Sequence, residues 1–260
     1  MPLTLDENYL IIKKKLIKLN IKTIIPTRDS ELEFWSKYKT KFKNSGIEII
    51  VNNYKKINVC NDKLKFDEFC RKNKILTPRT KDKLNIKNTK VIIKERFNSS
   101  KIITKNIILE KAKYKLGKYR SPFIQEYIKG REISVDIWSS KTKNKNYFIT
   151  RYRDLIINGE SQVTTSFDDE KLNKIVLQII KKLKLIGPYM LQFIEKNKKY
   201  YLIECNPRIG GASTFSINYG LDMILWSLIE NYNIERELPI NFTKNNQSNK
   251  LVRIPLDTYQ

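Results

Sequence analysis

The stretch KYYLIECNPRIGGAST, residues 199–214, decides the fold prediction. It is typical of a buried strand that ends in a carboxylate, an amide and an arginine, followed by a loop of small residues and an apolar helix. Side chains alternate between the two faces of a strand, so Glu204 and Asn206 are expected to point the same way. Two oxygen-bearing side chains beside an arginine and a glycine pair suit a magnesium ion and a phosphate. The stretch therefore favours an ATP site over a purely structural role.

A second predicted strand extends this pattern. Tyr189–Glu195 is expected to form a hairpin with the strand described above, and a three-residue connection centred on Lys198 would place Gln192 directly opposite Glu204. Three oxygen donors side by side are costly to bury without a counter-charge. Each of them alone would be an ordinary polar residue at a strand end. The three together, followed by an arginine and two glycines, favour a metal site.

The composition limits the class of protein. A chain of 260 residues can bury a large core in one multi-lobed domain or two small ones. Its 40% hydrophobic content and 14 tyrosines argue against disorder. No apolar run approaches the roughly 20 residues of a membrane helix, and we find no signal-peptide pattern, so no membrane partner is expected. Three scattered cysteines are too few for a disulfide framework or a zinc site, so we expect reduced thiols and a cytoplasmic protein.

The chain contains no histidine and carries a net charge of +24. Its chemistry must therefore use carboxylates, amides, arginine, lysine and a hard metal. The lysines are spread along the whole chain, among asparagines and isoleucines that share AT-rich codons. Codon bias is a sufficient explanation, and we favour it over a dedicated nucleic-acid face, which requires clustered charge.

Strands that alternate with helices at the start of the chain predict an α/β fold with parallel strands. The predicted helices span residues 8–20, 32–38 (capped by Asp29 or Ser30), 62–73, 171–185 (ended by Gly187) and 214–229. The predicted strands span residues 22–26, 47–51, 91–94, 121–128, 133–139, its antiparallel neighbour 147–153, 189–195, 199–206 and 251–256.

Four sequence features resemble the motifs of the ATP-grasp superfamily. They are Lys94 on a predicted strand, QEYIKGRE at residues 125–132, Gln192, and ECNPR at residues 204–208. The likeness is greatest to the carbamoyl-phosphate-synthase-like members and covers approximately residues 22–256.

The resemblance implies an ATP-grasp fold, in which two α/β lobes clamp ATP. We expect a truncated pre-ATP-grasp α/β lobe at residues 1–58, a small lid lobe with the helix that leads into it at 59–128, and a large lobe with the metal site at 129–260. The implied activity is that of an ADP-forming carboxylate–amine ligase, which activates a carboxylate as an acyl phosphate. The implied cofactors are ATP and Mg²⁺ or Mn²⁺. A reaction on bicarbonate is a variant within this class.

The resemblance also implies a role for each matching residue. Lys63 and Lys94 would contact ATP phosphates. Glu126 and Ile128 would hold adenine, largely through backbone groups, and Glu132 would bind the ribose hydroxyls. Gln192, Glu204 and Asn206 would hold the metal, with Gln192 also near the nucleotide, and Arg208 would bind the carboxylate and its acyl phosphate. Lys94 and Arg208 are the expected catalytic residues.

Weaker candidates for substrate contacts remain open. Arg151 and Arg153 share a face of their predicted strand and would touch a substrate or phosphate, or lie in solvent. Ser213 belongs to the small-residue loop, which would either bind an anion through backbone amides or only cap a helix. Arg28 and Asp29 follow a strand end, where open α/β sheets bind ligands.

Two departures from the family pattern keep other functions open. The loop after Lys94, residues 95–100, has no glycine, although Ser99 and Ser100 could donate to phosphate. The N-terminal lobe is short, so a homo-oligomer or a partner chain that supplies a missing unit is left open. A non-catalytic ATP-binding protein is the alternative to the ligase. A basic nucleic-acid-binding protein ranks below both.

Overall fold

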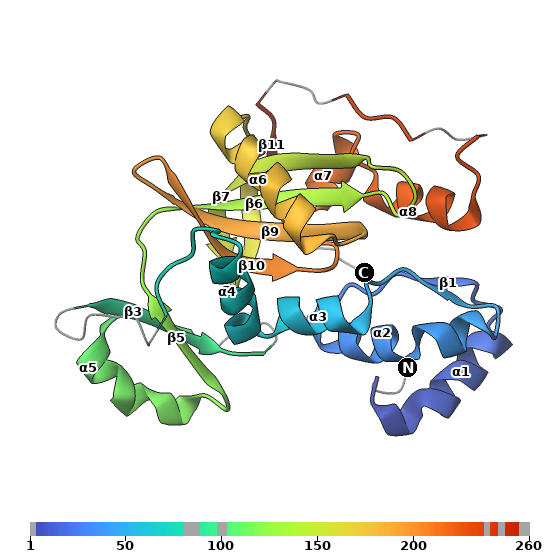
Figure 1. Ribbon diagram of the computed structural model, residues 1–260, viewed down its shortest axis with the longest axis horizontal. Helices are drawn as coiled ribbons and strands as arrows, with labels where there is room; N and C mark the ends of the chain where they lie inside the picture. The colour runs from blue at the N-terminus through green and yellow to red at the C-terminus, as the bar shows by residue number, and fades with distance from the viewer. Residues whose placement is uncertain (1–3, 81–88, 98–102, 237–239, 244–247, 255–260) are drawn as a thin grey trace, which may run out of the picture.

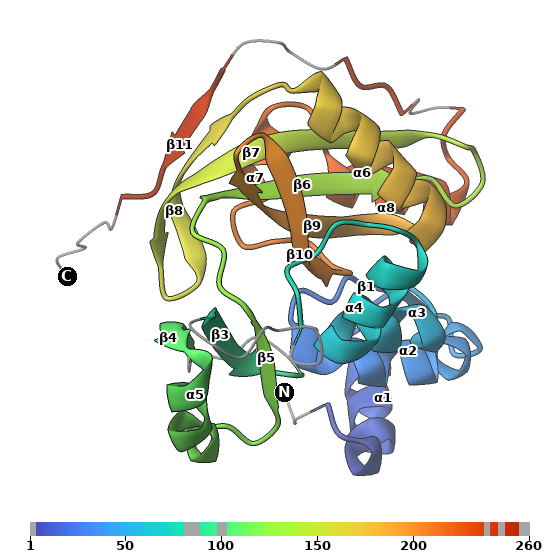
Figure 2. The same ribbon diagram turned by 60° about the vertical axis from the view of Figure 1, so that its left-hand side comes forward.

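The computed structural model describes residues 4–80, 89–97, 103–236, 240–243 and 248–254. Its helices and strands form three groups around three sheets: a two-stranded, a three-stranded and a six-stranded sheet (Figures 1 and 2). This mixed α/β arrangement confirms the predicted fold class. Ser99 and Ser100 lie outside the described residues.

The N-terminal group contains a parallel pair of short strands, as the sequence predicted. Its elements are η1 (Asp6–Asn8), α1 (Tyr9–Lys18), β1 (Thr23–Ile24), α2 (Asp29–Lys43) and β2 (Glu48–Ile49). Ile12, Trp35 and Phe42 are buried in its own apolar core. The predicted caps of α2 were wrong: the helix begins at Asp29 itself, and its cap residue Arg28 makes no side-chain cap bond.

Two helices lead from this group to the rest of the molecule. They are α3 (Tyr54–Asn61) and α4 (Lys63–Lys72), and Asp62 caps α4 by accepting from the backbone N–H of Leu64. Phe66 and Cys70 of α4 pack into the core of the six-stranded sheet, although we assigned this helix to the small lobe. The predicted lobe boundaries remain predictions.

The small sheet has the order β4-β3-β5 and is antiparallel. Its elements are β3 (Lys90–Glu95), β4 (Thr104–Ile108), α5 (Leu109–Ala112), η3 (Lys113–Lys118) and β5 (Pro122–Glu126). Val91 and Ile93 are fully buried, and they leave Lys94 on the opposite face of β3. The sequence analysis did not predict β4 or α5.

The large sheet has the order β10-β9-β6-β7-β8-β11, with antiparallel neighbours throughout. Its strands are β6 (Arg131–Ser139), β7 (Asn146–Ile157), β8 (Glu160–Ser166), β9 (Gly187–Lys196), β10 (Lys199–Asn206) and β11 (Lys250–Val252). Helix α6 (Glu170–Leu183) and α4 pack against one face, and α7 (Thr214–Asn218) and α8 (Met223–Tyr232) pack against the other. The antiparallel pairing of β6 with β7 confirms the predicted pairing of residues 133–139 with 147–153.

Three details differ from the predicted elements. The helix expected over residues 214–229 breaks into α7 and α8, because Gly220 takes φ +90° and Asp222 starts a new helix by accepting from Leu225. Helix α6 ends at Leu183, because Lys184 adopts the left-handed conformation before Gly187 is reached. Strand β8 was not predicted.

The hairpin between β9 and β10 pairs Gln192 with Glu204, as predicted, but by a different route. The connection has two residues, Asn197 and Lys198, both in the left-handed region that a tight hairpin turn requires. This turn alone would pair Gln192 with Ile203. An irregularity between Leu202 and Glu204 shifts the register by one residue and places the two side chains opposite each other.

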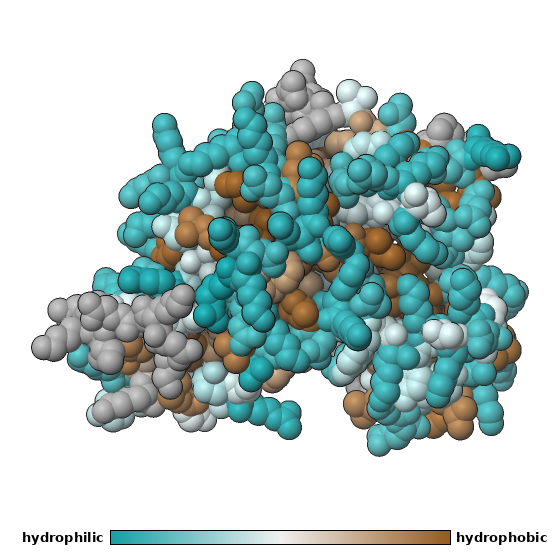
Figure 3. Space-filling view, viewed as in Figure 1, coloured by the Kyte–Doolittle hydropathy of each residue, from teal (hydrophilic) through white to brown (hydrophobic). Residues whose placement is uncertain are grey.

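Hydrophilic side chains are spread over both the upper and the lower part of the face shown in Figure 3, with smaller apolar areas between them. This agrees with the even distribution of lysine along the sequence. No described helix has the length and apolarity that crossing a membrane requires.

Candidate functional site

A cavity of about 840 Å³ lies where the three parts of the molecule meet. The small sheet and the large sheet contribute opposite walls, and residues 27–30, at the start of α2, contribute one end. Among the described residues that were predicted for the site, all except Ser213 line this cavity: Arg28, Asp29, Lys63, Lys94, Glu126, Ile128, Glu132, Arg151, Arg153, Gln192, Glu204, Asn206 and Arg208. Residues far apart in the sequence are thus brought to one place.

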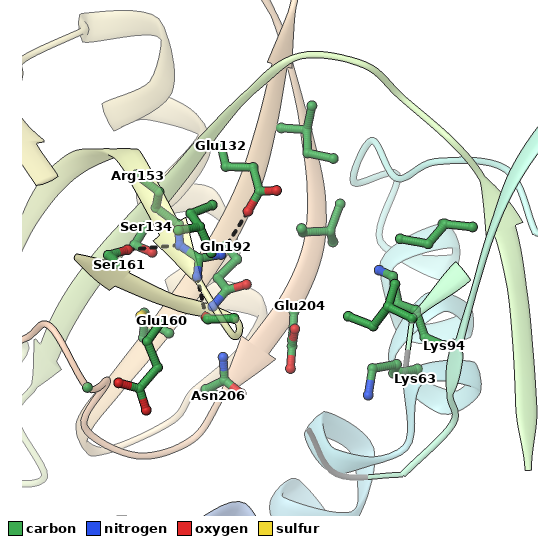
Figure 4. Close-up of a pocket in the computed structure, with 18 of the residues that line it drawn as sticks. Lys63, Lys94, Glu132, Ser134, Arg153, Glu160, Ser161, Gln192, Glu204 and Asn206 are labelled. Carbon is green, nitrogen blue, oxygen red and sulfur yellow. Dashed lines mark hydrogen bonds and ion pairs between the residues drawn. The ribbon is translucent and has the colours of Figure 1, made fainter. Parts of the chain in front are cut away.

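Lys63 and Lys94 lie on the small-lobe wall and point across the cavity toward Glu204 (Figure 4). The backbone N–H of Lys63 donates to the backbone carbonyl of Arg96, just beyond β3, at 3.1 Å. The Arg96 guanidinium binds the Asp62 carboxylate through two hydrogen bonds of 2.7 Å. These contacts hold the start of α4 beside the end of β3. They explain why the two lysines lie together.

The ammonium group of Lys94 is enclosed without a carboxylate in ion-pair distance among the described residues. Its Nζ donates to the Gln125 side chain at 3.4 Å. Burial lowers the pKa of Lys94 to about 8; the charge of Glu204 opposes this shift, and that of Lys63 adds to it. An anion placed between the lysines would stabilise the charged form of Lys94.

Gln192, Glu204 and Asn206 lie on the opposite wall, on β9 and β10 (Figure 4). Asn206 is 4% exposed, and Glu204 and Gln192 are partly buried. Carboxylate and amide oxygens are suitable ligands for a hard cation, so the donor set fits Mg²⁺ or Mn²⁺. Within the described parts of the chain there is no cluster of three or more Asp, Glu, His or Cys side chains that could hold a metal. A cation here would need further oxygen ligands from a bound molecule such as a nucleotide.

Glu132 and Arg153 form an ion pair on the floor of the cavity. The Arg153 Nη1 lies 2.8 Å from Glu132 Oε2, and its Nε donates to Ser161 at 3.0 Å. The Arg153 side chain is 8% exposed, and burial lowers its pKa while Glu132 opposes that shift. Glu132, predicted to bind ribose, therefore already binds an arginine, with Lys105 at 3.9 Å on its other oxygen.

Arg151 and Ser213 meet at a carboxylate that the sequence analysis missed. The fully buried Asp136 binds Arg151 Nε at 2.8 Å and accepts from the hydroxyls of Ser213 and Ser216, both at 2.7 Å. Burial alone would raise the pKa of Asp136, but Arg151 and the two serines hold it below the usual range.

This cluster shows where the Ser213 side chain lies. The residue is fully buried and its hydroxyl is bound to Asp136, so the side chain does not line the cavity, and Arg151 is only 1% exposed. Anion binding by the backbone amides of the loop stays a prediction. Ser213 also accepts from the backbone N–H of Gly210 at 3.0 Å, which fixes the loop after Arg208. An aspartate in ISVDIW, a strand with four apolar residues, was the available signal.

Arg208 is bound to the N-terminal group. Its Nε and Nη2 contact the two carboxylate oxygens of Asp29 at 2.6 and 2.5 Å, and Nη1 donates to the carbonyl of Ile209 at 2.9 Å. This is the bidentate arrangement in which arginine binds carboxylates. Asp29 thus binds Arg208 in the way expected for a substrate carboxylate. The neighbouring Arg28 is exposed and pairs with Glu31.

The expected adenine contacts lie at the end of β5. The N–H of Glu126 donates to the carbonyl of Arg79 at 2.7 Å, and the Glu126 carboxylate binds the Arg79 Nε at 2.9 Å. These contacts engage the backbone N–H and the carboxylate of Glu126. Ile128, 5% exposed, follows on the way to β6 and lines the cavity.

Ser134 and Glu160 are among the polar residues of the cavity that were not predicted for the site. The hydroxyl of Ser134, on β6 opposite Gln192, is buried and has no hydrogen-bond partner among the described residues. Glu160 begins β8 directly after a two-residue turn at residues 158–159. The Asn-Gly dipeptide of this turn was a usable signal for the hairpin.

Comparisons with known proteins identify the class. The family model of the ATP-grasp domain matches residues 60–212, more than half of the chain. The protein therefore belongs to the ATP-grasp family, which confirms the resemblance found in the sequence. A search of curated proteins found no match.

Solved structures share the fold at low sequence identity. Biotin carboxylase from Campylobacter jejuni, in complex with beta-gamma-ATP, has a TM-score of 0.72 and 15% identity, over 92% of this chain and 59% of that one. The biotin carboxylase domain of 2-oxoglutarate carboxylase from Hydrogenobacter thermophilus, with MgADP, ADP and bicarbonate, has a TM-score of 0.73 and 16% identity, over 86% and 56%. L-amino acid ligase from Bacillus licheniformis has a TM-score of 0.61 and 16% identity, over 78% and 53%. The chain spans less than two thirds of the length of each.

Proposed function

We propose that the protein is an ATP-dependent ligase, which activates a carboxylate as an acyl phosphate, releases ADP and joins the acyl group to an amine. One observation carries this proposal: two lysines on one wall of the cavity face Gln192, Glu204 and Asn206 on the other. Cations opposite oxygen ligands suit a triphosphate with its metal ion. The ATP-grasp family and the nucleotides named with two similar structures support the same choice.

The cofactors in this proposal are ATP and Mg²⁺ or Mn²⁺. Gln192, Glu204 and Asn206 would hold the metal, which supplies charge neutralisation on the transferred phosphoryl group when bound. Lys94 would gain about 4 kcal/mol from a phosphate charge at 4 Å with an effective dielectric near 20, before desolvation is subtracted. Lys63 would contact the same phosphates.

The remaining roles follow the positions around the cavity. Ile128 and Glu126 would contact adenine, and Glu132 would contact ribose. Arg208 would release Asp29 and bind the carboxylate of the substrate in its place. The lobe boundaries at residues 58 and 128, a cytoplasmic location, and a homo-oligomer or a partner chain remain part of the proposal.

The test begins with calorimetry of magnesium-ATP binding, followed by ADP release in the presence of carboxylate and amine pools. We expect binding, and ADP release that needs both magnesium and a carboxylate. Glu204→Ala should abolish release, whereas Glu110→Ala, the same change at an exposed position on α5, should not. Absence of magnesium-ATP binding in the unaltered protein would remove the proposal.

A non-catalytic ATP-binding protein is the second candidate. The ion pair between Arg208 and Asp29 favours it, because the guanidinium expected to bind substrate is already bound. Magnesium-ATP binding without ADP release, for any pool of amino acids, dipeptides or sugar acids, would favour this candidate over the ligase.

A further inference from the structure

We propose that Glu160 is the catalytic carboxylate for the amine substrate: it binds the ammonium group and takes a proton from it before the nitrogen attacks the acyl phosphate. This inference rests on the ligase function proposed above. It adds the residue and the end of the cavity at which the amine would react.

Glu160 has the position that this role requires. The turn at residues 158–159, with φ of +52° and +83°, presents it at the start of β8. Its side chain is 63% exposed while it lines the cavity, and Figure 4 shows it on the far side from Lys63 and Lys94. A Cβ placed on Gly211 would lie 3.8–4.0 Å from the atoms of its carboxylate group. The carboxylate therefore lies against the loop that follows Arg208.

The other carboxylates that line the cavity are committed to other groups in the described structure. Asp29 binds Arg208, Glu132 binds Arg153, Glu126 binds Arg79, Glu95 accepts from the backbone of Arg120 and Ser121, and Glu204 belongs to the proposed metal site. Glu160 has one longer contact, with Arg253 Nη1 at 3.4 Å. It is the carboxylate that an incoming cation can reach with the least displacement.

Arg253 orients this carboxylate. The backbone N–H of Arg253 donates to Gln162 at 2.9 Å, and its guanidinium donates to the carbonyl of Gly211 as well as facing Glu160. The arginine on the neighbouring strand, Arg153, is directed to Glu132 and Ser161 instead. Arg253 leaves part of the Glu160 carboxylate exposed, where an ammonium group can bind.

The chemistry requires such a group. An amine is largely an ammonium ion at neutral pH and cannot attack until it loses a proton, and the chain has no histidine to accept it. In the proposed step Glu160 takes that proton, the C–N bond forms, and the C–O bond to phosphate breaks. The leaving phosphate takes the second proton from the nitrogen, so that an amide, phosphate and protonated Glu160 result. Solvent then removes the proton from Glu160.

The experiment compares two nucleophiles in the Glu160→Gln variant. Hydroxylamine is already unprotonated at neutral pH, so it traps an acyl phosphate as a hydroxamate without a base. We expect the variant to keep hydroxamate formation and ADP release with the active carboxylate pool, while amide formation from protonated amines falls about 10²–10⁴-fold. At pH values below the pKa of the amine, the rate of amide formation by the variant should increase tenfold for each unit by which the pH is raised.

Glu110→Gln, the matched exposed control, should behave like the unaltered protein. Equal loss of hydroxamate and amide formation in Glu160→Gln would overturn the inference, because Glu160 would then act in the first half-reaction or in folding. Unchanged amide formation would overturn it as well. Absence of ADP release and hydroxamate from the unaltered protein would instead remove the ligase function, and the role of Glu160 with it.

Discussion

Two cations of the same cavity differ in how their charge is compensated. Arg151, fully buried, is paired with Asp136 and also donates to Thr164. Lys94, on the other wall, contacts the Gln125 amide, and burial lowers its pKa to about 8. A buried charge is costly to separate from its fitted counter-ion, whereas an enclosed charge without one gains most when an anionic ligand arrives.

The largest expected effect comes from removing the counter-ion of Arg151. Asp136→Ala leaves a buried guanidinium uncompensated and should lower the free energy of unfolding by about 3–5 kcal/mol, measured by urea denaturation. The double variant Asp136→Leu, Arg151→Met should recover most of this loss, because apolar side chains can replace a buried pair. A loss below about 1 kcal/mol in the single variant would show that the pair does not hold the large sheet and its loop together.

Removing the charge of Lys94 should weaken ATP binding without lowering the free energy of unfolding. Lys94→Met should weaken magnesium-ATP binding about 10–100-fold, since part of the Coulomb gain with phosphate is offset by desolvation. The free energy of unfolding should stay the same or rise, because an enclosed ammonium group is removed. Lys90→Met, on the same strand but exposed, should change neither quantity. If Lys94→Met lowers the free energy of unfolding and leaves ATP affinity unaltered, then Lys94 has a structural role, as Arg151 does, and does not bind ATP.

A substitution in the loop between Arg208 and Ser213 should have a smaller effect on stability. A Cβ on Gly210 would lie 2.7 Å from the Met190 sulfur and 3.0 Å from the Ser213 hydroxyl. Gly210→Ala should therefore cost about 1–3 kcal/mol of stability in thermal or urea unfolding. Gly211→Ala is the matched control, with contacts no closer than 3.8 Å, and should stay within about 0.5 kcal/mol. Equal effects at both glycines would contradict this account of the loop.

The parts of the fold and site that the sequence predicted are those fixed by local spacing. The alternation of side chains on β10 and the short hairpin were enough to pair Gln192 with Glu204, although the turn length was wrong by one residue and the bulge compensated. The break in the helix at Gly220 also had a local signal, because glycine disfavours a helix interior.

The ion-pair partners could not be predicted because they are set by distant parts of the chain. Asp29 and Arg208 are 179 residues apart, and Ser213 and Asp136 are 77 residues apart. A motif shows which side chain is present, but whether its charge serves a ligand or a buried carboxylate depends on the packing of separate lobes. For this reason the sequence could not show that Ser213 is committed to Asp136.

The lowered pKa of Lys94 makes stability and binding depend on pH in opposite directions. In the free protein the group loses its proton near pH 8, and in the unfolded chain near 10.5. Between these values the unfolded chain binds more protons, so the contribution of Lys94 to stability rises with pH. Phosphate binding favours the charged form and should weaken over the same range.

The smallest expected effect is the proton that accompanies this binding. If phosphate restores the ordinary pKa of Lys94, magnesium-ATP binding should take up about half a proton at pH 8, more at pH 9 and almost none at pH 6.5. Calorimetry in two buffers with different heats of ionisation measures this number directly. Lys94→Met should abolish the uptake, and Lys90→Met should leave it unchanged. Proton release at pH 8–9, or uptake that survives in Lys94→Met, would mean that the cation facing Glu204 does not receive the phosphates, and the contrast with Arg151 would then lose its functional meaning.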